Sequence, residues 1–280
     1  MEDATEFHYR VPWRAVSSYP GSHHSIQRGG GFEFRGTAPL YVAGDPRRFD
    51  LRASLRDPFG QLLVRVFNQR SIVPVFVLAD VSASMSFVGH TCKFDLLIDF
   101  ASSLAYSAHR VGDPFAFTAC DTVIRDELSL PLTRTPVAGT LVWERLRRWA
   151  PSGADATALL AGAEQIAGAR ALVFLVSDYH LPVDLLQGIL SRLGPHTVIP
   201  VVLVDSAEGR IPGFGITYLY DSETQTRQTV FMRRSLAKRL EKKLLEHREK
   251  ISRCLADFDL KPLYLTDKFE PDAVTRYFFE

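Results

Sequence analysis

The chain has 280 residues, of which 46% are hydrophobic and 23% are charged, the proportions of an ordinary globular protein. Its formal net charge of +1 gives no overall field that would draw it to nucleic acid or to a membrane surface. Three scattered cysteines exclude a disulfide framework and a cysteine-rich zinc site, and they suit a reducing compartment.

Residues 1–71 show no regular pattern of strands and helices, and we interpret them as an N-terminal extension. The acidic start lacks the regions of a signal peptide, and no apolar run approaches the roughly 18 residues that span a bilayer. We therefore expect a cytoplasmic protein without membrane insertion. The glycines at 29–31 would fit a mobile segment, but disordered segments seldom carry aromatic residues. Residues 20–70 are thus expected to pack on the main domain through Phe32, Phe34, Tyr41 and Phe49.

From residue 72 strands and helices alternate. The apolar run 72–79 predicts a strand buried on both faces, and apolar residues at three- and four-residue spacing predict a helix over 94–111, capped by Gly112. Further strands are expected at 114–119, 171–176, 197–204 and 262–265, with an edge strand at 121–130. Helices are expected at 141–149, 157–166, 183–193 and 233–258. This alternation predicts that residues 72–280 form an α/β domain, a doubly wound parallel sheet with a long C-terminal helix.

Polar side chains follow two of these strands, at the edge where open α/β sheets place their sites. The first strand runs into Asp80, Ser82 and Ser84 at alternate positions, and a later strand ends beside Asp178. Such residues also form ordinary loops and helix caps. Two strands that deliver carboxylates to one edge, beside a pair of hydroxyls, favour a metal site instead. Hard oxygen donors of this kind suit Mg²⁺, with Mn²⁺ or Ca²⁺ as alternatives.

The segment from Asp80 to Met85 resembles the metal-ion-dependent adhesion site of von Willebrand factor A domains. Its flanks, 44–50 and 62–67, resemble those of domain-of-unknown-function family 58, and the resemblance covers roughly residues 20–270. It implies a von Willebrand factor A, Rossmann-like fold. It also implies that Ser82 and Ser84 bind the ion directly, while Asp80 and Asp178 hold its water ligands.

Relatives usually add a threonine ligand from a Gly-Gly-Thr-Asp-like loop. Here the loop reads Gly153-Ala154-Asp155-Ala156-Thr157, so that Ala154 stands at the threonine position. By this resemblance Thr157 would have to reach back to the ion, or Asp155 would have to compensate for the missing hydroxyl.

The resemblance also implies a function. Members of this family are similar to accessory proteins that work with MoxR-type AAA+ ATPases in the maturation of, or metal insertion into, a client protein. The short form is most similar to the MxaS-type accessory proteins of methanol-oxidation operons, which would make methanol dehydrogenase the client. We therefore expect a non-catalytic module, without catalytic residues, that captures an acidic residue of its client through the ion.

Two other functions compete with this interpretation. The first is a Mg²⁺-dependent phosphohydrolase with Asp80 as nucleophile, but Ser82 stands where a second carboxylate is usual and no lysine follows on the next loops. The second is a nucleic-acid binder that uses Arg47, Arg48, Arg52 and Arg56 and the C-terminal helix, which the near-neutral charge disfavours. His180, two residues past Asp178, is interpreted as a surface histidine at the mouth of the site.

Overall fold

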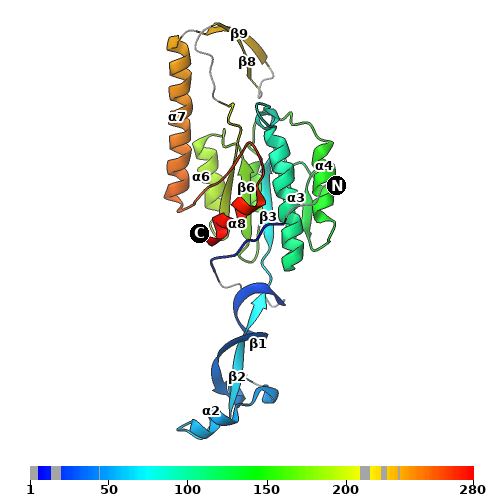
Figure 1. Ribbon diagram of the computed structural model, residues 1–280, viewed down its shortest axis with the longest axis vertical. Coiled ribbons are helices and arrows are strands. Elements are labelled where there is room, and N and C mark those ends of the chain that lie inside the picture. The colour runs from blue at the N-terminus through cyan, green and yellow to red at the C-terminus, as the bar shows by residue number, and fades with distance from the viewer. Residues whose placement is uncertain (1–5, 14–19, 44, 209–214, 222–225, 233) are drawn as a thin grey trace. The chain divides into compact units, whose positions relative to one another are not determined.

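The structure of the chain is a computed structural model, which divides into two compact units (Figure 1). One unit comprises Met1–Tyr9 with Pro74–Glu280, and the other is Arg10–Val73. The residues that the structure describes are 6–13, 20–43, 45–208, 215–221, 226–232 and 234–280. Within these ranges, side chains are not described at 20–22, 24–33, 68–70, 215–221, 226–232 and 234.

A six-stranded sheet forms the centre of the larger unit, with the strand order β10-β7-β6-β3-β4-β5. All neighbours run parallel except β4 and β5. This is the order of a doubly wound fold, in which β3 and β6 lie at the switch point where ligands bind. The predicted fold class is therefore confirmed. The strands are β3 (Val75–Asp80), β4 (Phe115–Cys120), β5 (Leu130–Thr133), β6 (Leu172–Ser177), β7 (Thr197–Val204) and β10 (Leu263–Thr266).

Helices cover both faces of this sheet, because neighbouring side chains of a buried strand point to opposite sides. Val173 and Leu175 belong to the core cluster formed with α5, α6 and α7. Phe174 points to the other face, where its ring lies 5.5 Å from Phe100 of α3 and 6.2 Å from Phe278 of α8. The helices of this unit are α3 (Lys93–Val111), α4 (Ala138–Arg147), α5 (Leu159–Gln165), α6 (Val183–Arg192), α7 (Arg234–Asp257) and α8 (Pro271–Phe279).

Several boundaries differ from the sequence-based expectation. Residues 121–129 form a loop rather than the expected edge strand, because the Asp121 carboxylate accepts hydrogen bonds from Val123 N and Arg125 Nε and turns the chain. Helix α4 begins earlier than expected, and Gly139 in its first turn allows a close approach to α3, since a Cβ there would lie 2.8 Å from Ser102 O. An antiparallel hairpin of β8 (Gly215–Asp221) and β9 (Thr226–Met232) precedes α7 and was not predicted.

The smaller unit is an antiparallel ladder of β1 (Pro20–Pro39) and β2 (Leu63–Ser71) with several register shifts. Asp50 caps α2 and pairs with Arg65 at 2.7 Å. The Phe34 ring lies 6.0 Å from Phe67, and Phe34 and Tyr41 are 58% and 81% exposed. That these rings and Phe49 pack on the main domain stays a prediction, and the Phe32 side chain lies outside the described residues. The short helices here are α1 (Leu40–Ala43), η1 (Pro46–Arg48) and α2 (Leu51–Arg56).

None of the helices in the described residues is both long enough and apolar enough to cross a membrane.

Residues near the start of the chain complete the core of the larger unit. The buried Phe7 ring stacks at 5.9 Å on Phe100 and lies 6.3 Å from Phe269. The Tyr9 hydroxyl donates a hydrogen bond to Asp113 Oδ2 at 2.6 Å. These contacts tie the segment to the same face of the sheet as α3.

We expect Phe7→Ala to lower the free energy of unfolding by about 3 kcal/mol, because it removes a fully buried ring and leaves a cavity. Phe279→Ala, which truncates a ring that is 53% exposed, is the matched control and should cost less than about 1 kcal/mol. Denaturant unfolding of both variants measures the two losses of unfolding free energy. A loss for Phe7→Ala as small as that of the control would contradict the placement of Phe7 in the core.

Candidate metal site at the carboxyl edge of the sheet

Asp80 lies at the centre of the carboxyl edge of the sheet, at the end of the buried strand β3. Its neighbours across the sheet are Cys120 of β4 and the end of β6. The side chain is buried, and its Oδ1 accepts a hydrogen bond from Ser82 N at 2.9 Å. Its Oδ2 accepts one from the Ser177 hydroxyl at 2.8 Å. Both carboxylate oxygens are therefore fixed in position.

The two serines after Asp80 lie with their hydroxyl oxygens 3.2 Å apart. The loop that carries them is held by the backbone of Gly153, which pairs with Ser82 and accepts a hydrogen bond from Ala83 N at 2.8 Å. A Cβ at Gly153 would lie 2.5 Å from the Asp121 carboxyl group, so only glycine fits at this contact. Ser84 is half-buried and Ser82 is buried, which leaves a partly open pair of hydroxyl ligands.

Two further predicted ligands, Asp155 and Thr157, form a turn of their own. Asp155 Oδ1 accepts hydrogen bonds from Thr157 N at 3.0 Å and from the Thr157 hydroxyl at 2.7 Å, and this turn is exposed. Within the described ranges, no hydrogen bond joins Asp155 or Thr157 to Ser82 or Ser84. Their part in metal binding stays a prediction, and the structure offers no contact that supports it.

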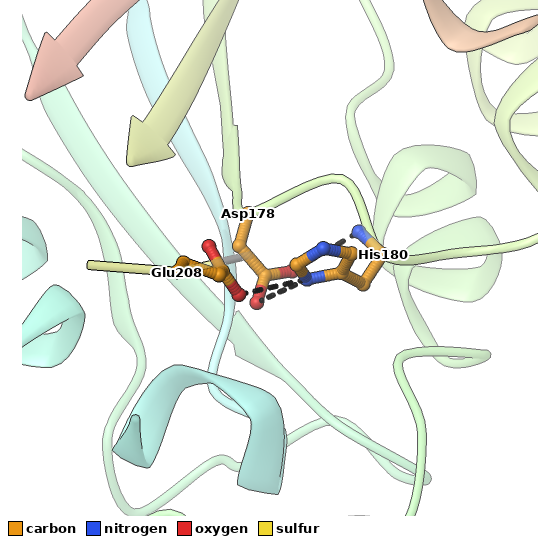
Figure 2. Close-up of side chains that lie close together, drawn as sticks. All are labelled: Asp178, His180 and Glu208. Carbon is orange, nitrogen blue, oxygen red and sulfur yellow. Dashed lines mark hydrogen bonds and ion pairs between the residues drawn. The ribbon is translucent and has the colours of Figure 1, made fainter. Parts of the chain in front are cut away.

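Asp178 shares the edge with Asp80 but is engaged by basic groups. Its Oδ2 lies 2.6 Å from Lys93 Nζ and 3.1 Å from His180 Nδ1, and its Oδ1 accepts a hydrogen bond from His180 N. Lys93 Nζ also lies 2.9 Å from Glu208 Oε1. Figure 2 shows the side chains of Asp178, His180 and Glu208 turned toward one another. His180 is thus part of the site, not merely a surface residue as the sequence suggested.

The residues predicted for the site did not include Ser177, Lys93 or Glu208. A signal existed for Ser177, since it directly precedes Asp178 at the end of a strand. Lys93 is the first residue of α3, where a lysine is normally expected to be solvent-exposed. In the structure it is buried. Glu208 lies beyond β7 in a loop without any distinguishing pattern. These partners come together only in the folded chain.

The pKa values of the two carboxyl groups are driven apart. Burial and the neighbouring charge of Asp178 raise the pKa of Asp80 above its usual range. Burial would also raise the pKa of Asp178, but the His180 hydrogen bond and the Lys93 charge hold it well below its usual range. Burial would lower the pKa values of Lys93 and His180. Their contacts with Asp178 and Glu208 outweigh burial and raise the pKa of each. Asp80 is therefore the carboxylate whose charge the fold leaves least compensated.

These residues fit a hard divalent ion in part. Across the described residues, no basic side chain lies within ion-pair distance of the buried Asp80. Neighbouring ligands of an octahedral ion at about 2.1 Å lie about 3 Å apart, close to the separation of the Ser82 and Ser84 hydroxyls. Asp178, in contrast, is shared with Lys93 and His180. Asp80, Ser82 and Ser84 would hold the ion, with Asp178 available only if it leaves a basic partner.

A cavity of about 260 Å³ adjoins this edge, between α7, β7 and β10. His180 and Glu208 line it together with His247, whose ring stacks at 6.5 Å on that of His180. Pockets for small molecules usually measure about 300–1,000 Å³. The cavity is thus large enough for a protein side chain and small for an organic cofactor.

Another buried carboxylate, that of Asp205, fixes the loop between the serines and α3. It accepts hydrogen bonds from the backbone N–H groups of Gly89, His90 and Thr91 at 2.9–3.1 Å, and from Ala207 at 2.8 Å. Burial alone would raise the pKa of Asp205, but these amide donors lower it to about 2. The charged carboxylate is therefore a structural anchor for the loop.

A family model described as "Protein of unknown function DUF58" matches residues 38–250. A Paracoccus denitrificans protein described as "Uncharacterized protein in moxR 3'region" is 36% identical over 95 residues, 34% of this chain and 90% of that protein.

Two solved structures from Bacteroides are also similar to the chain. The conserved hypothetical protein BatB of Bacteroides thetaiotaomicron is 11% identical, with a TM-score of 0.42 over 73% of this chain and 96% of that one. An aerotolerance-related membrane protein of Bacteroides fragilis is 15% identical, with a TM-score of 0.42 over 74% of this chain and 96% of that one. At these values neither structure bears on function.

We expect Asp205→Asn to lower the free energy of unfolding at neutral pH by about 2 kcal/mol, because an amide cannot accept from all these N–H groups. Since folding lowers the pKa of Asp205, its contribution is present above about pH 4 and is lost as pH falls toward 2. Thermal unfolding from pH 7 to pH 2 should show the variant and the wild type converging at the acid end. Asp259→Asn, at an exposed aspartate, is the control, and a gap that stays constant with pH would contradict this assignment.

Proposed function

The chain belongs to the DUF58 family, and we propose that it is a non-catalytic interaction module with a metal-ion-dependent adhesion-type site. In this proposal Asp80, Ser82 and Ser84 hold a divalent ion, Mg²⁺ or Mn²⁺. An acidic side chain of a bound client protein then fills the open coordination position. The module would work with a MoxR-type AAA+ ATPase in maturation of, or metal insertion into, the client complex.

The observation that carries the proposal is that the buried Asp80 carboxylate has no positively charged partner among the described residues. A buried carboxylate is costly unless a positive charge lies nearby. The Asp80 carboxylate accepts hydrogen bonds from two neutral groups, Ser82 N and the Ser177 hydroxyl. It also lies near a second carboxylate, that of Asp178. A divalent ion at the adjacent hydroxyl pair would supply the missing charge. The site is then incomplete in the isolated chain and complete with an ion.

The partner class rests on the relatives. The Paracoccus denitrificans protein is described by its position in the moxR 3′ region, and the chain covers 90% of it at 36% identity. Proteins that act together are often encoded together, which supports a MoxR-type ATPase as the partner. Methanol dehydrogenase as the client is the narrower form of the proposal and depends on the MxaS-type resemblance alone.

Binding through the ion follows from the ligands. The Ser82 and Ser84 hydroxyls supply no formal charge, and Ala154 stands where the resemblance implies a threonine ligand. An ion held this way remains attractive to an incoming carboxylate. By linkage, the ion strengthens client binding by the same factor by which the client strengthens ion binding.

A Mg²⁺-dependent phosphohydrolase remains the competing proposal, and one observation bears on it. No lysine was expected on the loops that follow Asp80, but Lys93 reaches this edge from the start of α3. Its ammonium group is buried and bonded to Asp178 and Glu208, so it is not free to meet a phosphate. Ser82 still occupies the place where such enzymes carry a second carboxylate.

The test uses Ser82→Ala combined with Ser84→Ala, which removes both hydroxyl ligands and leaves Asp80 in place. We expect Mn²⁺ affinity, measured by calorimetry, to fall at least tenfold, which is about 1.4 kcal/mol. Affinity capture in the presence of Mg²⁺ should recover a MoxR-type ATPase and a client with the wild type. The double variant should lose the client, because the ion no longer bridges to it.

Ser86→Ala is the matched control, since the Ser86 hydroxyl lies in the same loop but donates to Ala83 O at 2.7 Å. It should behave as the wild type. Capture of the same client in chelator, or by the double variant, would contradict metal-assisted binding. Mg²⁺-dependent hydrolysis of a phosphate ester that is lost in Asp80→Asn would favour the phosphohydrolase instead.

A further inference from the structure

Lys93 occupies a place that ordinarily disfavours a lysine. It is the first residue of α3, and its side chain is 1% exposed. Lysines are almost never fully buried without a partner, and the positive end of a helix dipole repels a cation. Both effects act against the ammonium group at this position. Its presence therefore requires strong anionic partners.

The partners are the groups that line the carboxyl edge. Lys93 Nζ lies 2.6 Å from Asp178 Oδ2 and 2.9 Å from Glu208 Oε1. One ligand atom each of Asp178, His180 and Glu208 lies within 4.8 Å of the other two, a spacing that could hold a metal ion. The ammonium group thus binds two of these three groups, as a metal ion bound among them would.

We propose that Lys93 is a tethered cation that competes with the divalent ion for Asp178 and thereby sets the ion affinity of the site. This inference rests on the proposed function of Asp80, Ser82 and Ser84 as an ion site. The ion and the Lys93 ammonium group draw on the same carboxylate, and their like charges repel. Lys93 is therefore a positioning residue that weakens ion binding until a client carboxylate adds negative charge.

The contacts of Asp178 explain why the competition is direct. Its Oδ2 meets both Lys93 Nζ and His180 Nδ1, and its Oδ1 accepts from His180 N at 3.1 Å. Oδ2 already meets two donors, so it can hold a water ligand of the ion only by loosening one of these contacts. Removing the Lys93 charge frees one acceptor position on Oδ2 and removes the repulsion at the same time.

The test compares Mn²⁺ binding by the full chain and its variants, measured by calorimetry and by electron paramagnetic resonance of the free ion. Lys93→Met keeps the length of the side chain and removes its charge, and we expect it to raise Mn²⁺ affinity at least tenfold. Arg147→Met is the matched control. It removes one positive charge from an exposed ion pair with Asp95. The Mn²⁺ affinity of this variant should stay within twofold of that of the wild type.

A second variant, Lys93→Met combined with Glu208→Gln, keeps the net charge of the wild type and leaves fewer unpaired carboxylates. It decides the question should Lys93→Met fail to fold, and it too should bind Mn²⁺ more tightly than the wild type. Wild-type affinity in a folded variant of either kind, as shown by circular dichroism, would overturn the role of Lys93 but leave the proposed function standing. No Mn²⁺ binding by the wild type or any variant would overturn both.

Discussion

Negative charge buried along one edge of the sheet is the constraint on which the rest of the larger unit depends. Each of the five parallel strands ends on an aspartate or directly before one: Asp80, Asp121, Asp178, Asp205 and Asp267. All but Asp267 are buried. A buried carboxylate is tolerated only where hydrogen bonds or opposite charges replace its lost hydration. The loops that follow the strands are therefore shaped by what they must supply to these groups.

Each aspartate is compensated differently, and the differences locate the site. Asp121 pairs with Arg125, and Asp178 pairs with Lys93. Asp205 is held by backbone amides, which also fix the loop before α3. Asp80 receives an amide and a hydroxyl but no positive charge among the described residues. The fold thus leaves one central carboxylate without a positive partner among the described residues, next to the serine hydroxyls, and in the proposed function a bound ion would balance it.

Much of this could be predicted from the sequence, because apolar runs and the residues directly after them are local signals. The run 72–79 predicted β3, and its continuation placed Asp80, Ser82 and Ser84 at the sheet edge where the structure has them. Lys93 and Glu208 could not be found this way, because their pairing depends on the return of distant segments to one point. The expected edge strand failed for a related reason, since the turn around Asp121 reflects a side-chain contact and not an apolar pattern.

The most direct measurement is thermal unfolding of the wild type and Asp80→Asn, each with and without Mn²⁺. If Asp80 is an uncompensated charge that an ion balances, Asp80→Asn without ion is at least as stable as the wild type. Mn²⁺ should then raise the melting temperature of the wild type alone. Asp121→Asn, which breaks the ion pair with Arg125, should be less stable than the wild type. Its loss of stability shows what removing a carboxylate with a positive partner costs. A loss of stability in Asp80→Asn as large as that in Asp121→Asn, with no effect of Mn²⁺ on the wild type, would contradict the account.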